Sequence, residues 1–377
     1  MIISGERASR KFRWLNFNVI ATVLFVKALI LIFGFQSYQI VTDKSLNDVY
    51  WFLGIWKHWD AESYLKIAQT GYTPSGENRF LLVFFPLYPT LVSAFNFIIR
   101  DYLVSAFVVT GVASIALGLI FRELVRLDYS EKIAQLSVLF LFIFPTAFFL
   151  HIPYTESLFL ALAVGSFLAA RKRSWIACGV LGALACLTRV NGLILFPALL
   201  FEIWAEYGET KKINRKWLFL ALIPAGFGAY LFLNYWVTGN PTMFLDYQRE
   251  HWKKYLRFPF YGIQGVWGSV YGRSASGSLM NGIQELLFVL IGFFAIVAGW
   301  RELRNSYRVW MILNWLLFVS TSFVQSVPRY TLVLFPLFIL MASASARSRW
   351  INVMFVVWSI LYLALFITQF VRGWWAF

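Results

Sequence analysis

Long apolar runs recur along the whole chain, separated by short polar segments. The first extends from about Leu15 to Phe35. Later runs begin near Phe80, Leu103, Ile133, Glu156, Trp175, Val190, Trp217, Ile283, Val309, Thr331 and Ile351. A helix needs about 20 mostly apolar residues to cross a bilayer. The pattern therefore predicts an all-α, polytopic helical membrane protein that forms a single integral membrane domain over residues 1–377.

The run at residues 80–99 differs from the others because it contains Pro86 and Pro89. Each proline removes a backbone donor and interrupts a helix, so we expect a juxtamembrane or re-entrant piece that is covered by protein. Without this run about 11 transmembrane helices remain. Four basic clusters then share the cytoplasmic side, as the positive-inside rule requires. They are Arg171–Arg173, Lys211–Lys216, Arg301–Arg308, and Arg347 with Arg349.

Two of the predicted extracytoplasmic segments are long, at residues 36–102 and 237–282. The first follows the apolar run that begins the chain, which we interpret as a retained span with a cytoplasmic N-terminus and not as a cleaved signal peptide. Lys27 within that span is expected to face the bundle or a polar cavity. Loops held by a rigid scaffold are where chemistry concentrates, so both long segments are candidate sites.

Composition agrees with a membrane protein: 60% of residues are hydrophobic, 20% are aromatic and only 14% are charged. The net charge of +15 lies mostly in short loops, where it specifies topology and not binding to nucleic acid. Cys178 and Cys186 share one apolar run and are expected to be packed thiols. The three histidines are far apart in sequence, which argues against a structural zinc site.

The first long loop carries a candidate catalytic carboxylate, Asp60. Residues 56–68 suit a short interfacial helix, which Gly71 would end. Asp60 near its start is placed to take a proton from a hydroxyl nucleophile at the membrane surface. Alternatively, it caps the helix or pairs with Lys57. Glu62 is two residues further on and points away from Asp60 on a helix, so the two are not expected to act as an acid–base pair.

Further polar residues lie where apolar runs begin or end. Glu156 opens one run with His151 nearby, which suggests either a carboxylate favoured by the helix dipole or one that shares a cavity with Asp60. Arg189, with Asn191, and Arg329, with Tyr330, lie at outer ends of spans against the positive-inside bias. Guanidinium groups there suit a lipid phosphate; interfacial snorkelling is the alternative.

Several of these strings resemble the PIG-V family, which comprises GPI mannosyltransferase 2 and its prokaryotic relatives. The resemblance spans residues 56–336 and rests on blocks that occur in the family's order. The blocks are Trp59-Asp60-Ala61, Ile67 to Tyr72, Phe84 to Pro89, Tyr154 to Phe159, Arg189 to Gly192, and Arg329-Tyr330.

The resemblance implies a GT-C type enzyme whose catalytic carboxylate lies in the first outer loop. Such an enzyme takes mannose from a polyprenyl phosphate donor, such as dolichyl phosphate mannose, and inverts the anomeric centre. By this likeness Asp60 is the base, and the other candidates bind substrate. They are Trp59, Glu62, Tyr64, His151, Glu156, Arg189, Asn191, Arg329 and Tyr330.

The implied partners are the polyprenyl-phosphate sugar, a glycan or glycolipid acceptor with a free hydroxyl, and membrane lipids. The chain is short for a eukaryotic member and lacks an N-x-Ser/Thr site in its outer segments, which favours a prokaryotic plasma membrane over the endoplasmic reticulum. Two questions stay open in the sequence. The same residues would also suit a transporter or flippase of a lipid-linked sugar, and Asp60 with Glu156 would suit a divalent cation with oxygen ligands.

Overall fold

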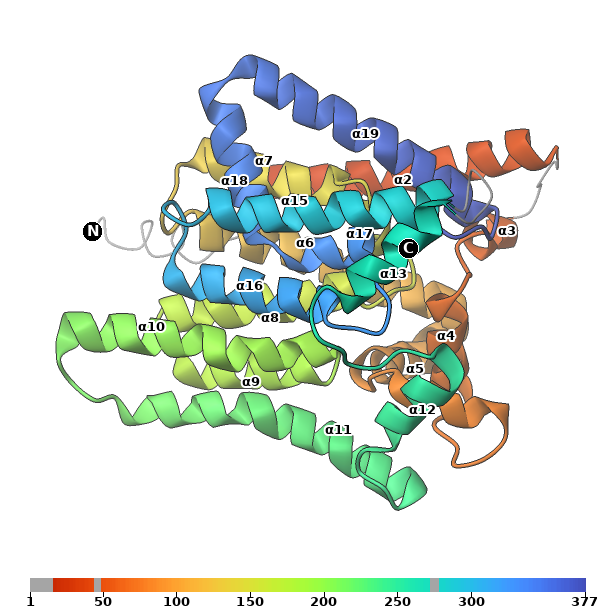
Figure 1. Ribbon diagram of the computed structural model, residues 1–377, viewed down its shortest axis with the longest axis horizontal. Helices are drawn as coiled ribbons and strands as arrows, with labels where there is room; N and C mark the ends of the chain where they lie inside the picture. Colours follow the sequence, from red (N-terminus) through yellow and green to blue (C-terminus); the bar gives the residue numbers. More distant parts are fainter. Residues whose placement is uncertain (1–15, 44–48, 272–277) are drawn as a thin grey trace, which may run out of the picture.

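The computed structural model describes residues 16–43, 49–271 and 278–377. Long helices pack side by side as a bundle, and shorter helices gather at one end of it (Figure 1). The described part of the chain contains no strand, only an isolated bridge between Leu256 and Thr321. The predicted helical membrane fold is therefore confirmed.

The first half of the chain runs from α2 to α9. Its helices are α2 (Phe17–Thr42), α3 (Val49–Gly54), α4 (Asp60–Thr70), η1 (Glu77–Val83), α5 (Leu87–Ile99), α6 (Tyr102–Val125), α7 (Glu131–Ile143), η2 (Ala147–Leu150), α8 (Glu156–Arg171) and α9 (Trp175–Cys186). Side-chain caps begin the two longest of these: Asn16 accepts from the amide of Val19, and Asp101 from that of Val104, which satisfies amides that a helix start leaves unpaired.

The second half runs from η3 to α19. Its helices are η3 (Val190–Ile194), α10 (Leu195–Thr210), η4 (Arg215–Ala221), α11 (Leu222–Thr238), α12 (Met243–Trp252), α13 (Tyr261–Tyr271), η5 (Leu279–Ile283), α15 (Gln284–Ala298), α16 (Asn305–Val319), α17 (Val327–Tyr330), η6 (Thr331–Val333), α18 (Pro336–Arg347) and α19 (Arg349–Val371). Residues 36–102 and 237–282, the two predicted long outer segments, contain α3 to α5 and α12 to α13 respectively.

Among the described residues, six helices are long and apolar enough to cross a bilayer, or up to eight if each of two bent pairs counts as one. This number is lower than the predicted 11 because several predicted spans form helices of 12 to 16 residues. One physical reason is visible at Pro145, which follows the end of α7 at Ile143. The proline-containing segment behaves as expected, since η1 and α5 meet at 110°.

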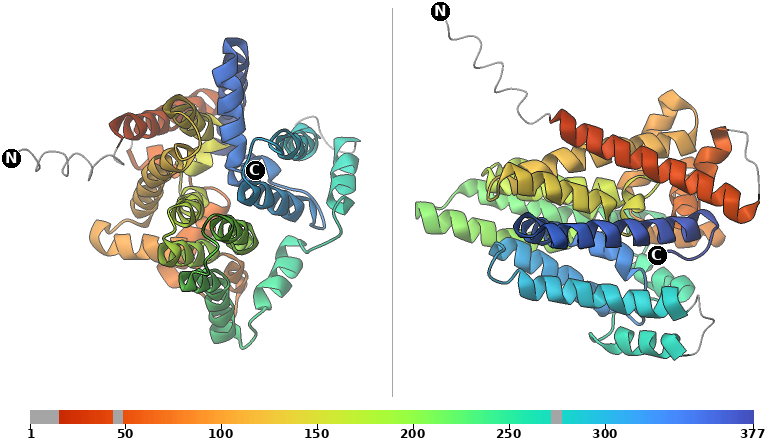
Figure 2. Two further views of the ribbon diagram at one scale, coloured as in Figure 1. Left: turned by 90° about the vertical axis from the view of Figure 1, so that its left-hand side faces the viewer. Right: turned by 90° about the horizontal axis from the view of Figure 1, so that it is seen from above.

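The bundle is apolar both inside and out. Buried aromatic residues fill its centre, among them Phe140, Phe142 and Trp310. Large apolar side chains such as Trp204 and Trp236 are exposed on outer helix faces, as expected for contact with lipid. Figure 2 shows the long helices end-on and from above, with α19 at the edge of the bundle.

Ion pairs join the loops at the end of the bundle opposite the short helices. They link the α6–α7 turn to the C-terminus of α8, and the α8–α9 turn to the end of α10. They also link the residue before α16 to α10, and the end of α18 to the loop before α16. The pairs are Arg122–Glu131, Arg171–Asp128, Arg173–Glu209, Arg304–Glu202 and Arg347–Glu302. The predicted basic clusters therefore do share one end of the molecule.

Candidate active site

Asp60 is the first residue of α4, a helix that lies at the end of the bundle where the short helices gather (Figure 1). The N-cap position belongs to Trp59, whose φ of 56° turns the chain sharply into the helix. The carboxylate of Asp60 is therefore free of any capping role, and the alternative interpretation as an N-cap is wrong. Gly71 ends the helix with a φ of +71°, as predicted.

Glu156 begins α8, and its side chain is almost completely buried. The same helix ends at Arg171 in the ion-paired loops, so Glu156 lies at the opposite end of the bundle from the basic clusters. A carboxylate in the first turn interacts favourably with the helix dipole. Burial of the charge nevertheless requires a cationic partner.

Arg329 supplies that partner from α17, a helix of four residues. Its Nε donates to Oε1 of Glu156 at 2.5 Å, and its Nη1 donates to Oδ2 of Asp60 at 2.7 Å. The guanidinium also lies over the rings of Phe149 and Tyr154, at 4.9 and 4.7 Å from their centroids. One arginine thus holds two carboxylates that come from distant parts of the chain.

The loop that carries Arg329 is anchored by Glu285 at the start of α15. The two oxygens of this buried carboxylate accept from the amides of Ser326 and Val327, at 2.7 and 2.8 Å. Ser326 has a φ of 66°, so the chain turns there into α17. In addition, Thr146 donates to the carbonyl of Pro328. These contacts fix the position of the Arg329 backbone.

Arg189 donates to the same oxygen of Glu156 as Arg329 does. Its Nη1 donates to Oε1 of Glu156 and, at 3.0 Å, to the hydroxyl oxygen of Thr155. Arg189 lies between α9 and η3, at the N-cap of η3. Asn191 in η3 donates to Asn314 of α16 at 2.7 Å. In the structure, Asn191 therefore joins η3 to α16.

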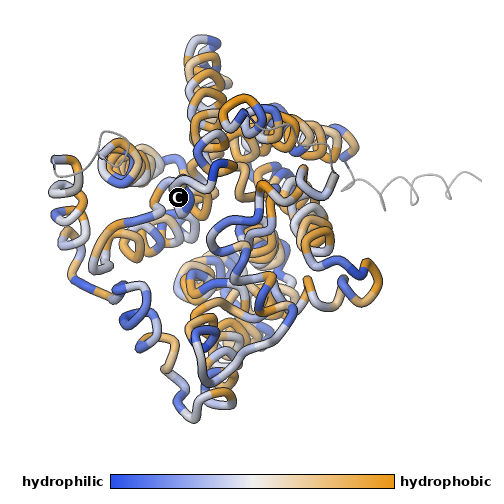
Figure 3. The backbone as a smooth tube through the Cα atoms, turned by 90° about the vertical axis from the view of Figure 1, so that its right-hand side faces the viewer, coloured by the Kyte–Doolittle hydropathy of each residue, from blue (hydrophilic) through white to orange (hydrophobic). Residues whose placement is uncertain are grey.

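Together the four charged groups form an alternating chain in the order Asp60, Arg329, Glu156, Arg189. We call this set the charge cluster. Glu156 and Arg329 are buried, whereas 31% of the Asp60 side chain is exposed. Only Oδ2 of Asp60 accepts from Arg329, so Oδ1 is outside this ion pair. Figure 3 looks onto this end of the bundle, where hydrophilic stretches cross between largely hydrophobic helices.

Tyr64 borders the charge cluster and lies one turn after Asp60 on the same helix. Its buried hydroxyl lies 3.5 Å from that of Thr155, and its ring packs edge-on against Phe84, Tyr88 and Tyr154. Burial, and secondly the negative charge of Asp60, raises the pKa of Tyr64. This phenol is therefore protonated at neutral pH and acts as a neutral wall of the site.

Besides Asn191, the predicted residues Trp59, Glu62 and His151 have side chains that make no hydrogen bond or ion pair with the charge cluster. Trp59 is about half exposed and packs edge-on against Trp375, and Glu62 is exposed. His151 is fully buried with its ring against Phe142, so it does not share the surroundings of Asp60 as expected, because the turn after η2 directs it into the core. Tyr330, by contrast, is at the site, where its ring lies 5.6 Å from the Arg189 guanidinium.

The residues present do not fit the divalent cation that the sequence left open. Arg329 lies between Asp60 and Glu156 and donates to both, so it takes the position that a bridging metal would need. In the part of the chain that the structure describes, no group of three or more potential metal ligands comes together. Positive charge between the two carboxylates comes from the protein itself.

Sequence reasoning missed two residues that shape this site. Glu285 gave no signal beyond being an acid at the start of an apolar run, which is itself unusual in a membrane helix. Tyr154 was noted only as part of a motif, although its hydroxyl donates to the carbonyl of His58 at 3.0 Å and its ring lies under Arg329.

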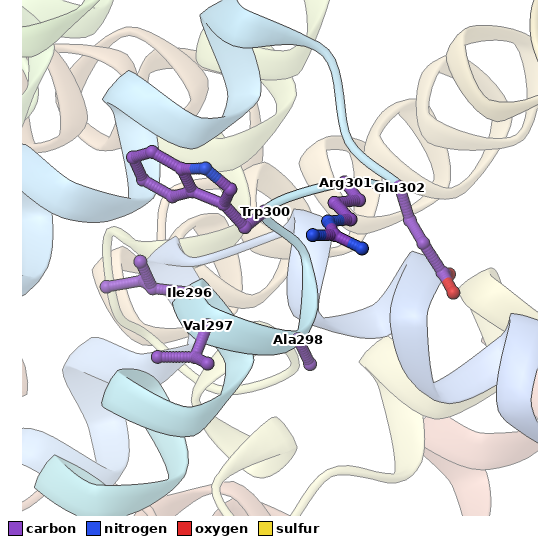
Figure 4. Close-up of a pocket in the computed structure, with 6 residues that line it drawn as sticks. All are labelled: Ile296, Val297, Ala298, Trp300, Arg301 and Glu302. Atoms are coloured by element: carbon purple, nitrogen blue, oxygen red, sulfur yellow. The ribbon is translucent and has the colours of Figure 1, made fainter.

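A hollow of about 540 Å³ lies at the C-terminal end of α15 (Figure 4) and is lined by Ile296, Val297, Ala298, Trp300, Arg301 and Glu302. It is therefore at the end that holds the basic loops and contains no residue of the charge cluster. A hollow of about 170 Å³ has Glu285 in its wall, the residue that anchors the loop carrying Arg329.

The fold has counterparts among solved structures. The structure of ArnT from Cupriavidus metallidurans bound to undecaprenyl phosphate matches with a TM-score of 0.52 at 15% identity, over 93% of this chain and 76% of that one. This likeness supports the predicted GT-C-like architecture.

Two weaker structural matches carry no further argument. The apo state of the same ArnT has a TM-score of 0.48 at 16% identity, over 86% of this chain and 60% of that one. The Archaeoglobus fulgidus oligosaccharyltransferase, in complex with zinc and sulfate, has 0.46 at 14% identity, over 93% and 53%. No family model and no curated protein sequence matches the chain, so the resemblance to the PIG-V family stays a prediction.

Proposed function

We propose that this multi-pass membrane protein is an inverting glycosyltransferase. It moves a mannosyl or other hexosyl residue from a polyprenyl-phosphate donor to a hydroxyl of a lipid- or surface-linked glycan. The reaction takes place on the extracytoplasmic face of a prokaryotic plasma membrane. The observation that carries the proposal is the charge cluster, in which one partly exposed carboxylate is held by a buried arginine at the end of a membrane bundle.

In this mechanism Asp60 is the base. The acceptor oxygen attacks C1 of the sugar while the bond from C1 to the phosphate oxygen breaks, and the electron pair leaves with the phosphate. The hydroxyl proton passes to Oδ1 of Asp60, the oxygen outside the ion pair with Arg329. Attack opposite to the leaving group inverts C1. A departing phosphate needs stabilisation of its charge more than a proton.

Arg329 acts as a positioning residue in this scheme. Its fork fixes Oδ2 of Asp60 and Oε1 of Glu156 at the same time, which a lysine could not do with the same geometry. Arg189 donates to the same oxygen of Glu156. The arrangement keeps the base in one orientation, and preorganisation of this kind lowers the barrier of the chemical step.

Two further observations support a lipid-phosphate donor. The fold resembles that of ArnT, whose structure contains bound undecaprenyl phosphate. The site also lies beside α4, whose buried face and exposed charged face suit the membrane interface. A polyprenyl donor stays in the bilayer, so its phosphate meets the protein at the level of the headgroups.

The test is a transfer assay with the purified full-length protein, synthetic prenyl-phosphate mannose and a panel of acceptors, with product stereochemistry determined by NMR. Asp60→Asn should abolish transfer, by at least about 10²-fold for loss of a general base. Asp246→Asn, the same change at an exposed position of α12, is the control. Undiminished transfer by a folded Asp60→Asn protein would reject the proposal.

The transporter alternative is separated from the enzyme in sealed vesicles. Movement of the prenyl-phosphate sugar across the bilayer with no new glycosidic bond would identify a flippase that uses these residues only for binding. Formation of the bond without such movement supports the enzyme.

A further inference from the structure

The charge cluster carries no net charge, because its two carboxylates face two guanidinium groups. A donor phosphodiester brings one negative charge, and a second develops on the phosphate as the sugar leaves. Both arginines are already engaged by carboxylates, so only their remaining N–H groups are free to donate to a phosphate. If the proposed function holds, a further cation beside the cluster helps to balance the added negative charge.

Lys254 is placed to be that cation. It follows α12 in a segment that pairs with the loop before α17. The amide of Arg257 donates to the carbonyl of Ser320 at 2.9 Å, and that of Ser322 donates to the carbonyl of Tyr255 at 2.8 Å. These bonds, with the bridge between residues 256 and 321, fix the backbone after Lys254, and the hydroxyl of Ser322 donates to the carbonyl of Lys253 before it.

The ammonium group of Lys254 points toward the charge cluster. Its Nζ lies 5.2 Å from the centroid of the Tyr330 ring, the same ring that the Arg189 guanidinium approaches to 5.6 Å. It also lies 5.9 Å from the ring of Phe323. The face of an aromatic ring attracts a cation without placing a negative charge beside it. The charge of Lys254 is therefore not neutralised by this contact.

No carboxylate pairs with Lys254 among the described residues. Glu285 is close enough to interact with it electrostatically, but both oxygens of Glu285 already accept from backbone amides. Lys254 is partly buried, so its charge is screened less than that of a surface lysine. Lys254 is therefore a cation beside Tyr330 that forms no ion pair in the described part of the chain.

Phe323, the second ring near Lys254, also lines a hollow of about 170 Å³. The rest of its wall is formed by Gly265, Val266, Asn281, Glu285, Val324 and Gln325. These residues come from α13, η5, the start of α15 and the loop before α17.

We propose that Lys254, above the ring of Tyr330, is the binding site for the phosphate of a prenyl-phosphate donor. This inference rests on the proposed function. A lysine suits the role because its ammonium is a compact point charge on a flexible stem, which can follow the phosphate as the sugar departs. Arg189 and Arg329 keep their carboxylates throughout.

The neighbouring Lys253 provides a matched control. It is exposed, and its ammonium donates to the carbonyl of Glu250 at 2.7 Å. Lys253→Met and Lys254→Met change the net charge of the protein equally. We would measure the binding of farnesyl phosphate to the full-length protein in detergent by calorimetry, with farnesol as the probe of the tail alone and inorganic phosphate as the probe of the anion alone.

Lys254→Met should weaken the binding of farnesyl phosphate about tenfold or more, as expected for loss of a charge-assisted contact. Lys253→Met should change it less than about twofold, and Lys254→Arg should retain most of it. Equal affinities of Lys254→Met and wild type, or an equal loss in both methionine variants, would overturn the proposal. Competition by inorganic phosphate as strong as by farnesyl phosphate would overturn a lipid donor as the ligand.

Failure of this inference can be told apart from failure of the proposed function. If wild type transfers sugar and Lys254→Met leaves the KM for the donor unchanged, the phosphate site is wrong and the function stands. If farnesyl phosphate binding depends on Lys254 but no sugar is transferred, the enzyme assignment fails and the phosphate site stands.

Discussion

Nη1 of Arg329 donates to Oδ2 of Asp60 across 2.7 Å, although the two residues are 269 positions apart in the chain. The contact joins the first outer segment to the loop before α18. Because Arg329 also donates to Glu156, substitutions at these three residues should have non-additive effects on the free energy of unfolding.

Arg329→Met should destabilise the protein by about 3 kcal/mol, at the low end of the cost of breaking a buried ion pair, because Glu156 keeps its contact with Arg189. The double variant Arg329→Met with Glu156→Gln removes one charge of each sign. It should therefore lose less than the sum of the single changes, by at least about 1 kcal/mol. Unfolding of all three variants in detergent gives the coupling, and additive losses would show that the pair is not formed.

Glu285→Ala should lower sugar transfer although Glu285 touches no reacting group. Removal of its carboxylate leaves the amides of Ser326 and Val327 without their acceptors, so the loop that positions Arg329 loosens. A positioning role predicts that kcat falls more than the KM for the donor. Glu285→Gln, which keeps one carbonyl oxygen as an acceptor, should recover part of the loss. Equal activity of Glu285→Ala and wild type would contradict this role.

The sequence predicted what depends on local pattern. Apolar runs located the helices, Gly71 located the end of α4, and Pro86 with Pro89 located the bend between η1 and α5. Asp60 was identified as a carboxylate in the aromatic first outer segment, and Glu156 as an acid where a span begins. Arg189 and Arg329 were identified because they lie at outer ends of spans against the positive-inside bias.

The partners themselves were not predictable, because they depend on tertiary packing. Nothing near Arg329 in the chain indicates Asp60 as its acceptor, and both arginines were expected to meet a phosphate where the structure gives each a carboxylate. His151 precedes Glu156 by five residues, yet one tight turn sends its ring into the core. Glu285 resembles any other acid at the start of a span.

Stability should fall as the pH drops below about 6.5, and His58 should account for part of the fall. Burial lowers the pKa of His58, and this outweighs the opposing effects of its bond to the backbone of Val371 and of the Glu62 charge. The unfolded chain therefore binds a proton at a higher pH than the folded protein does, which favours unfolding. The loss levels off below the folded pKa.

His58→Gln tests this, because glutamine cannot bind the proton. The unfolding midpoint of the variant should change less than that of wild type between pH 7.5 and about 5, and the difference between the two proteins isolates His58 from all other titrating groups. Parallel pH profiles would show that His58 is protonated equally well in both states.

Gly192→Ala should damage the site through the backbone that carries Arg189. A Cβ at Gly192 would lie 2.5 Å from the amide nitrogen of Cys186 and 2.7 Å from the carbonyl carbon of Ala185. Because these are backbone atoms, η3 has to move away from the end of α9, at a cost of about 1–3 kcal/mol. Arg189 would move with it and lose its geometry toward Glu156, so transfer should fall together with stability.

Gly208→Ala in α10 is the matched control for this substitution, since a Cβ there meets no atom within 4 Å. At a helical position the change should even stabilise the protein, by up to about 1 kcal/mol. The melting temperature and the transfer rate are measured for both variants, and both should be lower for Gly192→Ala. If Gly192→Ala melts and transfers like Gly208→Ala, the close packing of η3 on α9 is not what holds Arg189 in the charge cluster.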